Sequence, residues 1–196
     1  IWHQRMTQNQ AGDSCWMGCA MRCSHAVDEF ELTTGPLKGK KVLEYGCGVG
    51  TLTRKLAKRV LPGGHVYAYD MVAHNIKIAE RHLAHLAHVH LHHHPHLHHF
   101  KIDNSQPKVD VLISAAALSY IQKPQTVLKH LAGHLKKGGE VVFLDYDKFF
   151  FVLPNVYWMQ DQNYLMKIFS NAGLEVKIIK KRHVLWESIY IVGKKR

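Results

Sequence analysis

The stretch Val42-Leu43-Glu44-Tyr45-Gly46-Cys47-Gly48-Val49-Gly50-Thr51-Leu52-Thr53 decides the fold of this chain. An apolar run ends in an acid, glycines follow at alternate positions, and a helical pattern begins. Glycine lacks a Cβ atom, so its backbone can turn tightly and come close to a ligand. A strand that leads through such a loop into a helix forms the nucleotide-binding corner of an α/β sheet. The stretch therefore predicts a cofactor site, although a purely structural turn would use the same residues.

The loop differs from a dinucleotide fingerprint in two ways. Thr51 stands where Gly-x-Gly-x-x-Gly requires its last glycine, and the third glycine of this loop comes one residue early. Glu44 lies just before the loop, and its charge makes it a poor neighbour for a pyrophosphate. The acid suits a cofactor that carries a cationic amino-acid portion.

A second apolar run, 66–70, ends in Asp70. An acid about 20 residues beyond the glycine loop can accept hydrogen bonds from both hydroxyls of a ribose. Met71 follows it and offers a soft apolar side chain to a purine face. Asp70 could also cap the helix expected from Ala73, and the two roles are compatible.

Composition places the chain among soluble globular proteins. Its 196 residues are enough for one domain, 46% of them are hydrophobic, and no apolar run is long enough to span a bilayer. We expect no signal peptide, and with no demand for disulfides a cytoplasmic location. The net charge of +11 is spread along the chain, which favours a solvated surface over a nucleic-acid footprint.

Hydrophobic periodicity predicts strands that alternate with helices. We expect strands at 40–44, 66–70, 89–93, 109–114, 140–145, 175–180 and 188–192, and helices at 52–60, 73–87, 124–135 and 161–172. Such alternation predicts parallel βαβ units in a doubly wound α/β sheet. The last two strands have no helix between them, so they should form an antiparallel pair. We expect a helical cap segment over 1–37 and the cofactor-binding domain over 38–196.

Four segments, in this order and spacing, resemble class I S-adenosylmethionine (SAM) methyltransferases of the ubiquinone/menaquinone-type, small-molecule branch. They are 44–50, 66–71, 109–114 and 135–140. The resemblance implies a Rossmann-like, seven-stranded, mostly parallel sheet with an antiparallel C-terminal strand pair, and SAM as cofactor. It implies cofactor contacts from Glu44, Tyr45, Gly46, Cys47, Gly48, Gly50, Asp70, Met71 and Ser114, with Ser114 near the sulfonium.

One departure concerns the adenine contact. The family usually places an acid just after the third strand, where this chain has a run rich in histidine. The nearest acid is Asp103, and Asn104 follows it. Asp103, Asn104 or a backbone group could therefore take the adenine edge.

Ten histidines fall between His82 and His99. His88, His90, His92 and His94 alternate, so an extended segment would place them on one face, where they could bind Zn²⁺ or Ni²⁺. A biased, solvated edge without a ligand is the other interpretation. With ordinary pKa values near 6.5, the tract should gain charge below about pH 6 and alter stability or solubility.

Three cysteines, Cys15, Cys19 and Cys23, recur every four residues and would form a stripe on one helix. The spacing is not that of usual zinc sites. We expect the stripe to be packed in a core, with thiol chemistry or soft-metal binding as the alternative.

These features predict a methyltransferase that acts on a small molecule. The alternatives are methylation of a protein or RNA through the basic surface, and a non-catalytic His/Cys metal-binding protein on the same scaffold. Tyr120, Asp145 and Tyr146 follow the fourth and fifth strands and are weak candidates for catalysis. No membrane span is expected.

Overall fold

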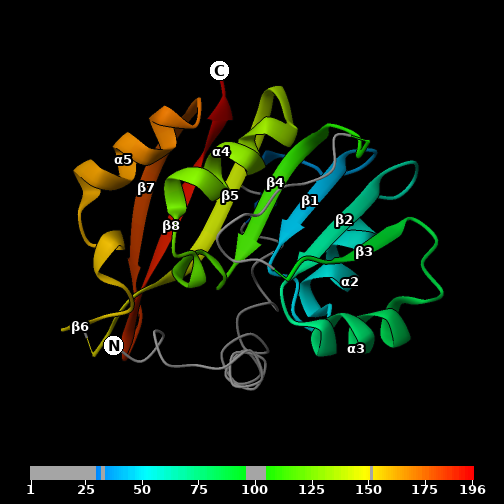
Figure 1. Ribbon diagram of the computed structural model, residues 1–196, viewed down its shortest axis with the longest axis horizontal. Helices are drawn as coiled ribbons and strands as arrows, with labels where there is room; N and C mark the ends of the chain where they lie inside the picture. Colours follow the sequence, from blue (N-terminus) through cyan, green and yellow to red (C-terminus); the bar gives the residue numbers. More distant parts are fainter. Residues whose placement is uncertain (1–29, 32–33, 96–104, 151) are drawn as a thin grey trace. The chain divides into compact units, whose positions relative to one another are not determined.

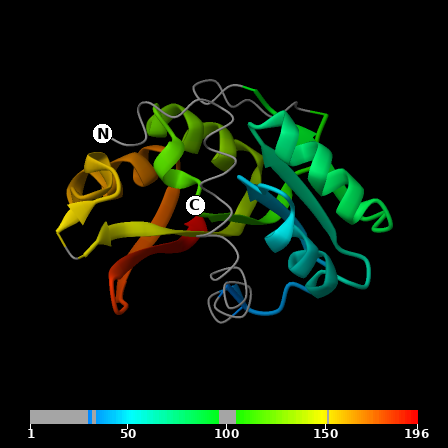
Figure 2. The same ribbon diagram turned by 90° about the horizontal axis from the view of Figure 1, so that it is seen from below.

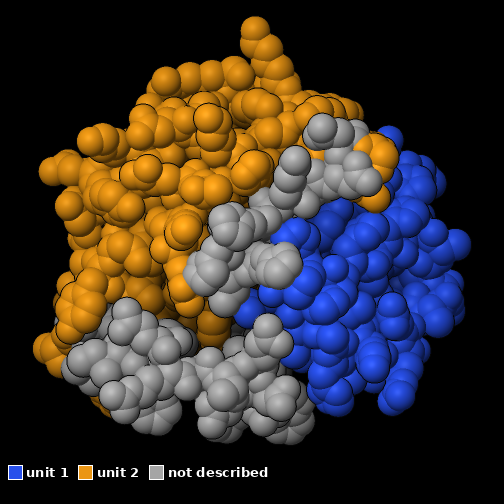
Figure 3. Space-filling view, viewed as in Figure 1, with its two compact units in different colours: residues 1–96 blue, residues 97–196 orange. Residues whose placement is uncertain are grey.

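The computed structural model of the chain describes residues 30–31, 34–95, 105–150 and 152–196. The contacts divide the chain into two compact units, 1–96 and 97–196 (Figure 3). Most of the predicted cap segment over 1–37, including the cysteine stripe, lies outside the described residues, as do Asp103 and Asn104.

In residues 35–95, the first unit contains three parallel strands and two helices (Figure 1). In chain order they are β1 (Lys41–Tyr45), α2 (Thr51–Arg59), β2 (His65–Asp70), α3 (Ala73–Leu83) and β3 (Val89–His93). The recorded strand order in this unit is β3-β2-β1. Leu43 pairs with Tyr67, which pairs in turn with His90, so β2 is central. Nearly every residue of β1 and β2 is buried, as expected for strands covered on both faces.

The helices of this unit bury one apolar stripe each. Leu52 and Leu56 lie one turn apart on α2, and Ile76 and Ala79 do the same on α3, and all four side chains are buried. The predicted helix over 73–87 ends earlier than expected, at Leu83, where the Leu86 N–H turns back onto the Leu83 carbonyl.

The described residues of the second unit, 105–150 and 152–196, contain four longer strands and the helices α4 and α5. In chain order its elements are β4 (Val109–Ala115), the 3₁₀ turn η2 (Leu118–Tyr120), α4 (Pro124–His134), β5 (Leu135–Phe149), β6 (Leu153–Pro154), the 3₁₀ turn η3 (Tyr157–Met159), α5 (Gln162–Asn171), β7 (Leu174–Arg182) and β8 (Trp186–Lys195). The order is β4-β5-β8-β7, with β6 paired to β5 outside this path.

The strand directions in the second unit agree with the prediction. β4 and β5 are parallel, while β8 runs antiparallel to both β5 and β7. Figure 2 shows α4 and α5 on the same side of these strands. Phe143 of β5 meets Phe169 of α5 edge to face, with ring centroids 5.6 Å apart, and both rings are fully buried. This contact lies in the core of the unit.

Two features of β5 differ from the sequence prediction. The strand begins at Leu135, directly after α4, because Leu135 already pairs with Val109. The segment 136–139 lies within β5, and the pairing with β4 shifts register there, because Val109 pairs with Leu135 and Val111 with Glu140. At the other end the strand continues to Phe149 and adds the short strand β6, which periodicity over two residues cannot predict.

None of the helices that the structure describes is long and apolar enough to cross a membrane.

Gly193 sits in β8 between two neighbouring strands and leaves no room for a side chain. An added Cβ would lie 2.0 Å from the Glu175 carbonyl oxygen and 2.7 Å from Val176 Cα, both backbone atoms. We expect Gly193→Ala to reduce the free energy of unfolding by about 2 kcal/mol or more, because β7 must move away. Gly133→Ala in α4 is the matched control, since nothing lies within 4 Å of that Cβ. Chemical denaturation of both variants measures the difference, and equal stability of the two would contradict it.

Stacked imidazoles join β2 to β3. His65 Nδ1 and His90 Nε2 are 3.1 Å apart, the His90 ring stacks on Tyr67, and the His92 ring stacks on Tyr69. Burial lowers the pKa of His90 and His92, and the neighbouring imidazoles His65 and His88 lower that of His90 further. In the folded protein, His90 and His92 therefore take up protons at lower pH than they do in the unfolded chain, where histidines titrate near pH 6.5.

We expect stability to be retained above about pH 6.5 and to decline as the pH falls below it, since the unfolded state then binds more protons. Urea denaturation between about pH 7.5 and 5.5 measures this dependence, which His90→Gln should weaken. His82→Gln, an exposed position on α3, should keep the wild-type dependence. If the stability of the wild type does not change with pH in this range, His90 and His92 do not have this role.

Candidate active site

The glycine loop after β1 is fastened to the end of β2. The N–H groups of Gly46 and Cys47 both donate to the Tyr69 carbonyl, at 2.8 and 3.0 Å. Gly46, Gly48 and Gly50 all have positive φ, a conformation that residues with a Cβ rarely adopt. The backbone conformation of the loop therefore explains why glycines stand at these alternate positions.

Gly50 has a second constraint, because its surroundings leave no space for a side chain. A Cβ there would lie 2.8 Å from Leu83 Cδ1 and 3.2 Å from Ala79 Cβ. The loop thus lies directly against α3, and α2 can begin at Thr51 close to the sheet.

Asp70 closes the loop from the opposite side. Its Oδ2 accepts the Gly48 N–H at 2.8 Å, and its Oδ1 accepts the Val72 N–H at 2.8 Å and the Asn75 amide at 3.3 Å. Burial raises the pKa of this carboxyl, and the three hydrogen bonds oppose that rise. The acid therefore lies beside the loop as expected, but it does not cap the helix, because Val72 is the N-cap residue of α3 and no side chain caps it. Each carboxylate oxygen can accept more than one hydrogen bond, so capacity remains for a ligand hydroxyl.

Glu44 is the most unusual group of the site. Its side chain is 1% exposed, and Oε2 has no hydrogen-bond partner within the part of the chain that the structure describes. Burial raises the pKa of this carboxyl to about 8, with the charge of Asp70 adding to the rise and the nearby Thr53 hydroxyl opposing it. The Thr53 contact falls short of hydrogen-bond geometry, because Thr53 Oγ1 also has no partner among these residues.

A buried carboxyl oxygen without a donor is costly, and natural structures rarely keep one without a reason. An acid that is neutral at pH 7 can become an anion when a cationic ligand approaches it. The chemistry of Glu44 therefore fits the ammonium group of an amino-acid ligand. Asn75 and Thr53 complete the surroundings, and both escaped sequence reasoning because only the folded loop brings them to the two acids.

The remaining predicted contacts of the first unit lie around this loop. Tyr45 is buried near Asp70, and burial raises the pKa of its hydroxyl. Cys47 is a buried thiol with no disulfide. Met71 is partly exposed, and its carbonyl lies 3.2 Å from His93 Nε2, which holds the residue after Asp70 in place.

In the second unit, Ser114 is fully buried near the end of β4. Ala116, just beyond the strand, has φ of 56°, a strained value for a residue with a Cβ. Asp145 is 1% exposed and accepts the N–H groups of Ser119 and Tyr146, at 2.8 and 2.7 Å. This carboxyl braces the turn after β4. Tyr120 and Tyr146 are partly exposed.

The alternating histidines do not converge on one point. His88 Nε2 lies 2.9 Å from the Ala57 carbonyl, His90 faces His65, and His92 stacks on Tyr69. Among the described residues no three His, Cys, Asp or Glu side chains are grouped as metal ligands would be. His94, the fourth candidate, lies just beyond β3, where its N–H donates to the Asp70 carbonyl.

Comparison with known proteins agrees with this geometry. Residues 36–187 match the family described as "Methyltransferase domain". The ubiquinone biosynthesis O-methyltransferase of Aeromonas salmonicida is 28% identical over 137 residues, which are 69% of this chain and 54% of that protein. The enzyme of the same name from Erwinia tasmaniensis is 31% identical over 107 residues, 55% of this chain and 42% of that protein. The chain thus spans about half the length of the curated relatives it matches.

Two solved structures show the same fold. A SAM-dependent methyltransferase from Aquifex aeolicus has a TM-score of 0.69 at 21% identity, and the match covers 89% of this chain and 90% of that one. Magnesium protoporphyrin IX methyltransferase from Synechocystis PCC 6803, solved with bound SAM, has a TM-score of 0.64 at 18% identity, covering 87% and 77%. At these identities the likeness concerns the fold, a Rossmann-like, mostly parallel seven-stranded sheet with antiparallel C-terminal strands, to which β6 is an addition.

Asp70 clamps the glycine loop, Glu44 is buried beside it, and the family match covers most of this chain. This chain therefore belongs to the methyltransferase domain family and has the class I SAM-dependent methyltransferase fold.

Proposed function

We propose that this protein transfers a methyl group from SAM to a small-molecule acceptor, and that the acceptor atom is a hydroxyl oxygen. The observation that carries the cofactor is Glu44, whose buried oxygen lacks a donor that an ammonium group would supply. The oxygen acceptor is inferred from the relatives, whose names describe O-methyltransferases of ubiquinone biosynthesis. No observation favours a protein or RNA acceptor. The expected cytoplasmic location stays a prediction.

Bound SAM would supply an activated methyl group on a sulfonium, so the protein's task is chiefly alignment. Glu44 would receive the amino group, and Asp70 would accept the ribose hydroxyls with its remaining lone pairs. The side chain of Met71 would pack against the purine. The backbone of Gly46 to Gly50 would follow the amino-acid portion closely, because none of the three glycines projects a side chain.

In the second unit we propose that Ser114 lines the site near the reacting methyl group, and that Asp145 acts as a positioning residue. Asp145 holds Ser119 and Tyr146 through their N–H groups, and Asn155 donates to the same carboxyl at 3.3 Å. With these donors in place it fixes the residues that follow β4 and β5. Tyr120 and Tyr146 remain the residues to test for contact with the acceptor.

Calorimetric titration with S-adenosylhomocysteine (SAH), the product of the cofactor, tests the proposal. The site residues of the first unit predict saturable binding by one SAH per chain. Absence of binding by the folded protein would overturn the enzyme assignment and leave a methyltransferase fold that serves another purpose.

Glu44 should link SAH binding to the release of a proton. The acid is largely protonated at pH 7, and an arriving ammonium group favours its anion, so binding drives the proton off. We expect SAH affinity to rise with pH between about pH 6 and 8 and then to level off. Titrations at pH 7 in two buffers of different ionisation enthalpy should reveal release of most of one proton.

The matched variant is Glu44→Gln, which keeps the shape of the neutral acid. It should fold as well as the wild type, bind SAH more weakly and release no proton. Undiminished proton release by this variant would exclude Glu44 as the source.

Asp70→Ala should weaken SAH binding by about 1–3 kcal/mol and also lower stability, because the buried N–H groups of Gly48 and Val72 lose their acceptor. Asn75→Ala is the control, since it removes one of the hydrogen bonds to the same carboxyl and leaves the acid in place. Its affinity should stay close to that of the wild type. Calorimetry and thermal unfolding separate the two effects, and wild-type affinity in Asp70→Ala would remove this acid from the site.

A further inference from the structure

Two turns of the second unit carry apolar side chains that are more than half exposed. Phe150 and Val152 belong to the turn between β5 and β6, and Val184 and Leu185 to the turn between β7 and β8. Their exposed fractions are 62%, 74%, 86% and 52%. We call these four residues the apolar tip. Single exposed apolar residues are common, whereas four on adjoining turns form a patch that suits a binding surface.

The two turns are joined through the backbone. The Phe150 N–H donates to the Leu185 carbonyl at 2.7 Å, and Phe149 pairs with Trp186 in the ladder between β5 and β8. The His183 N–H donates to the Trp186 carbonyl at 2.8 Å and closes the second turn. Figure 1 shows both turns at the same end of the unit's strands. The backbones of the two turns that carry the apolar tip are therefore adjacent.

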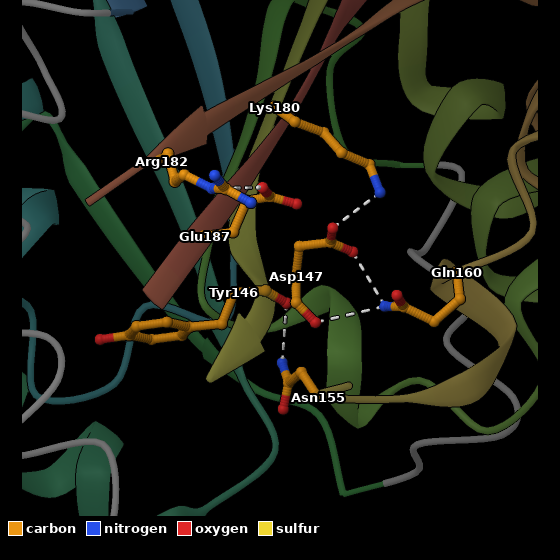
Figure 4. Close-up of polar contacts among 7 residues, drawn as sticks. All are labelled: Tyr146, Asp147, Asn155, Gln160, Lys180, Arg182 and Glu187. Atoms are coloured by element: carbon orange, nitrogen blue, oxygen red, sulfur yellow. Dashed lines mark hydrogen bonds and ion pairs between the residues drawn. The ribbon is translucent and has the colours of Figure 1, made fainter. Parts of the chain in front are cut away.

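A partly buried ion pair fixes the base of the tip (Figure 4). Asp147 of β5 is fully buried and bonds to Lys180 of β7 at 2.7 Å and to the Gln160 amide at 2.9 Å. Its carbonyl accepts the Asn155 N–H at 2.9 Å, just after β6. The segments that enter and leave the turns are thus held together. Phe150 has φ of 48°, a strained value for an aromatic residue, so the fold maintains an exposed ring at an energetic cost.

The charge around the tip is positive. Lys148 lies on β5 just before the first turn, and Lys181 and Arg182 lie at the end of β7 just before the second. The acid Glu187, at the start of β8, lies 4.0 Å from Arg182 and so offsets part of that charge. Long basic side chains can extend to a charged surface while apolar neighbours enter a less polar layer.

We propose that the apolar tip inserts into the interfacial layer of an anionic phospholipid bilayer, with Lys148, Lys181 and Arg182 at the level of the headgroups. Shallow burial of apolar side chains together with attraction between cations and anionic lipid is the usual basis of such reversible attachment. A second copy of the chain fits less well, because a two-fold contact through this tip would bring the same cations face to face. The proposal is independent of the proposed methyl transfer.

The test is flotation of the full chain with vesicles of phosphatidylcholine, alone or mixed with phosphatidylglycerol. We expect binding to the anionic vesicles, weaker binding to the neutral ones, and a decline with added salt. The double variant Phe150→Ser/Leu185→Ser should reduce the partition coefficient by about tenfold or more, because each serine removes a buried apolar side chain. Lys181→Gln/Arg182→Gln should abolish the preference for anionic vesicles.

Met166→Ser is the matched control, since Met166 is 44% exposed on α5, away from the two turns. It should bind vesicles as the wild type does, and all variants should keep the wild-type circular dichroism spectrum as a check on folding. The proposal is overturned if the wild type fails to float with anionic vesicles, or if Met166→Ser loses as much as the tip variant. It is also overturned if light scattering shows self-association that the tip variant abolishes while vesicle binding is absent.

Discussion

The hydrogen bond from the Gly48 N–H to Asp70 is the constraint on which the first unit depends. It joins the loop after β1 to the acid after β2, and the donors of Gly46 and Cys47 reinforce it through the Tyr69 carbonyl. The positive φ values of this loop require glycines, and glycines would leave the loop with high conformational entropy if these hydrogen bonds did not hold it. The clamp therefore makes a preformed site from the most flexible residue type, so that little ordering remains to oppose ligand binding.

Asp70 and Glu44 lie beside the same loop, but their surroundings differ. Asp70 accepts three hydrogen bonds that hold the loop and the start of α3. Glu44 is buried, and its Oε2 accepts no hydrogen bond from the described residues. Environment rather than residue type thus distinguishes a carboxyl that holds the loop from the one that we propose receives a ligand. In the second unit Asp145 resembles Asp70, since it too is buried and holds backbone N–H groups.

Much of this arrangement could be predicted from the residues, and the misses share a cause. Short periodic runs gave β2 and β3 with nearly correct bounds, and the spacing from Gly50 to Asp70 indicated which acid meets the loop. The length of β5 depends on pairing with Val109 and Trp186, which local periodicity does not contain. The same holds for the hydrogen bonds that Asp145 accepts from the N–H groups of Ser119 and Tyr146, which the sequence alone does not show. The missing partner of Glu44 is also a long-range property, invisible before the chain folds.

The close approach of Gly50 to α3 has a consequence for how such a site can change. Leu83 and Ala79 lie so close to Gly50 that a Cβ there would be 2.8 Å from Leu83 Cδ1 and 3.2 Å from Ala79 Cβ. The position of the glycine loop is therefore governed partly by a helix that need not touch any ligand. Efforts to adapt the protein to enlarged cofactor analogues should explore smaller residues at these two helical positions before altering the glycines themselves.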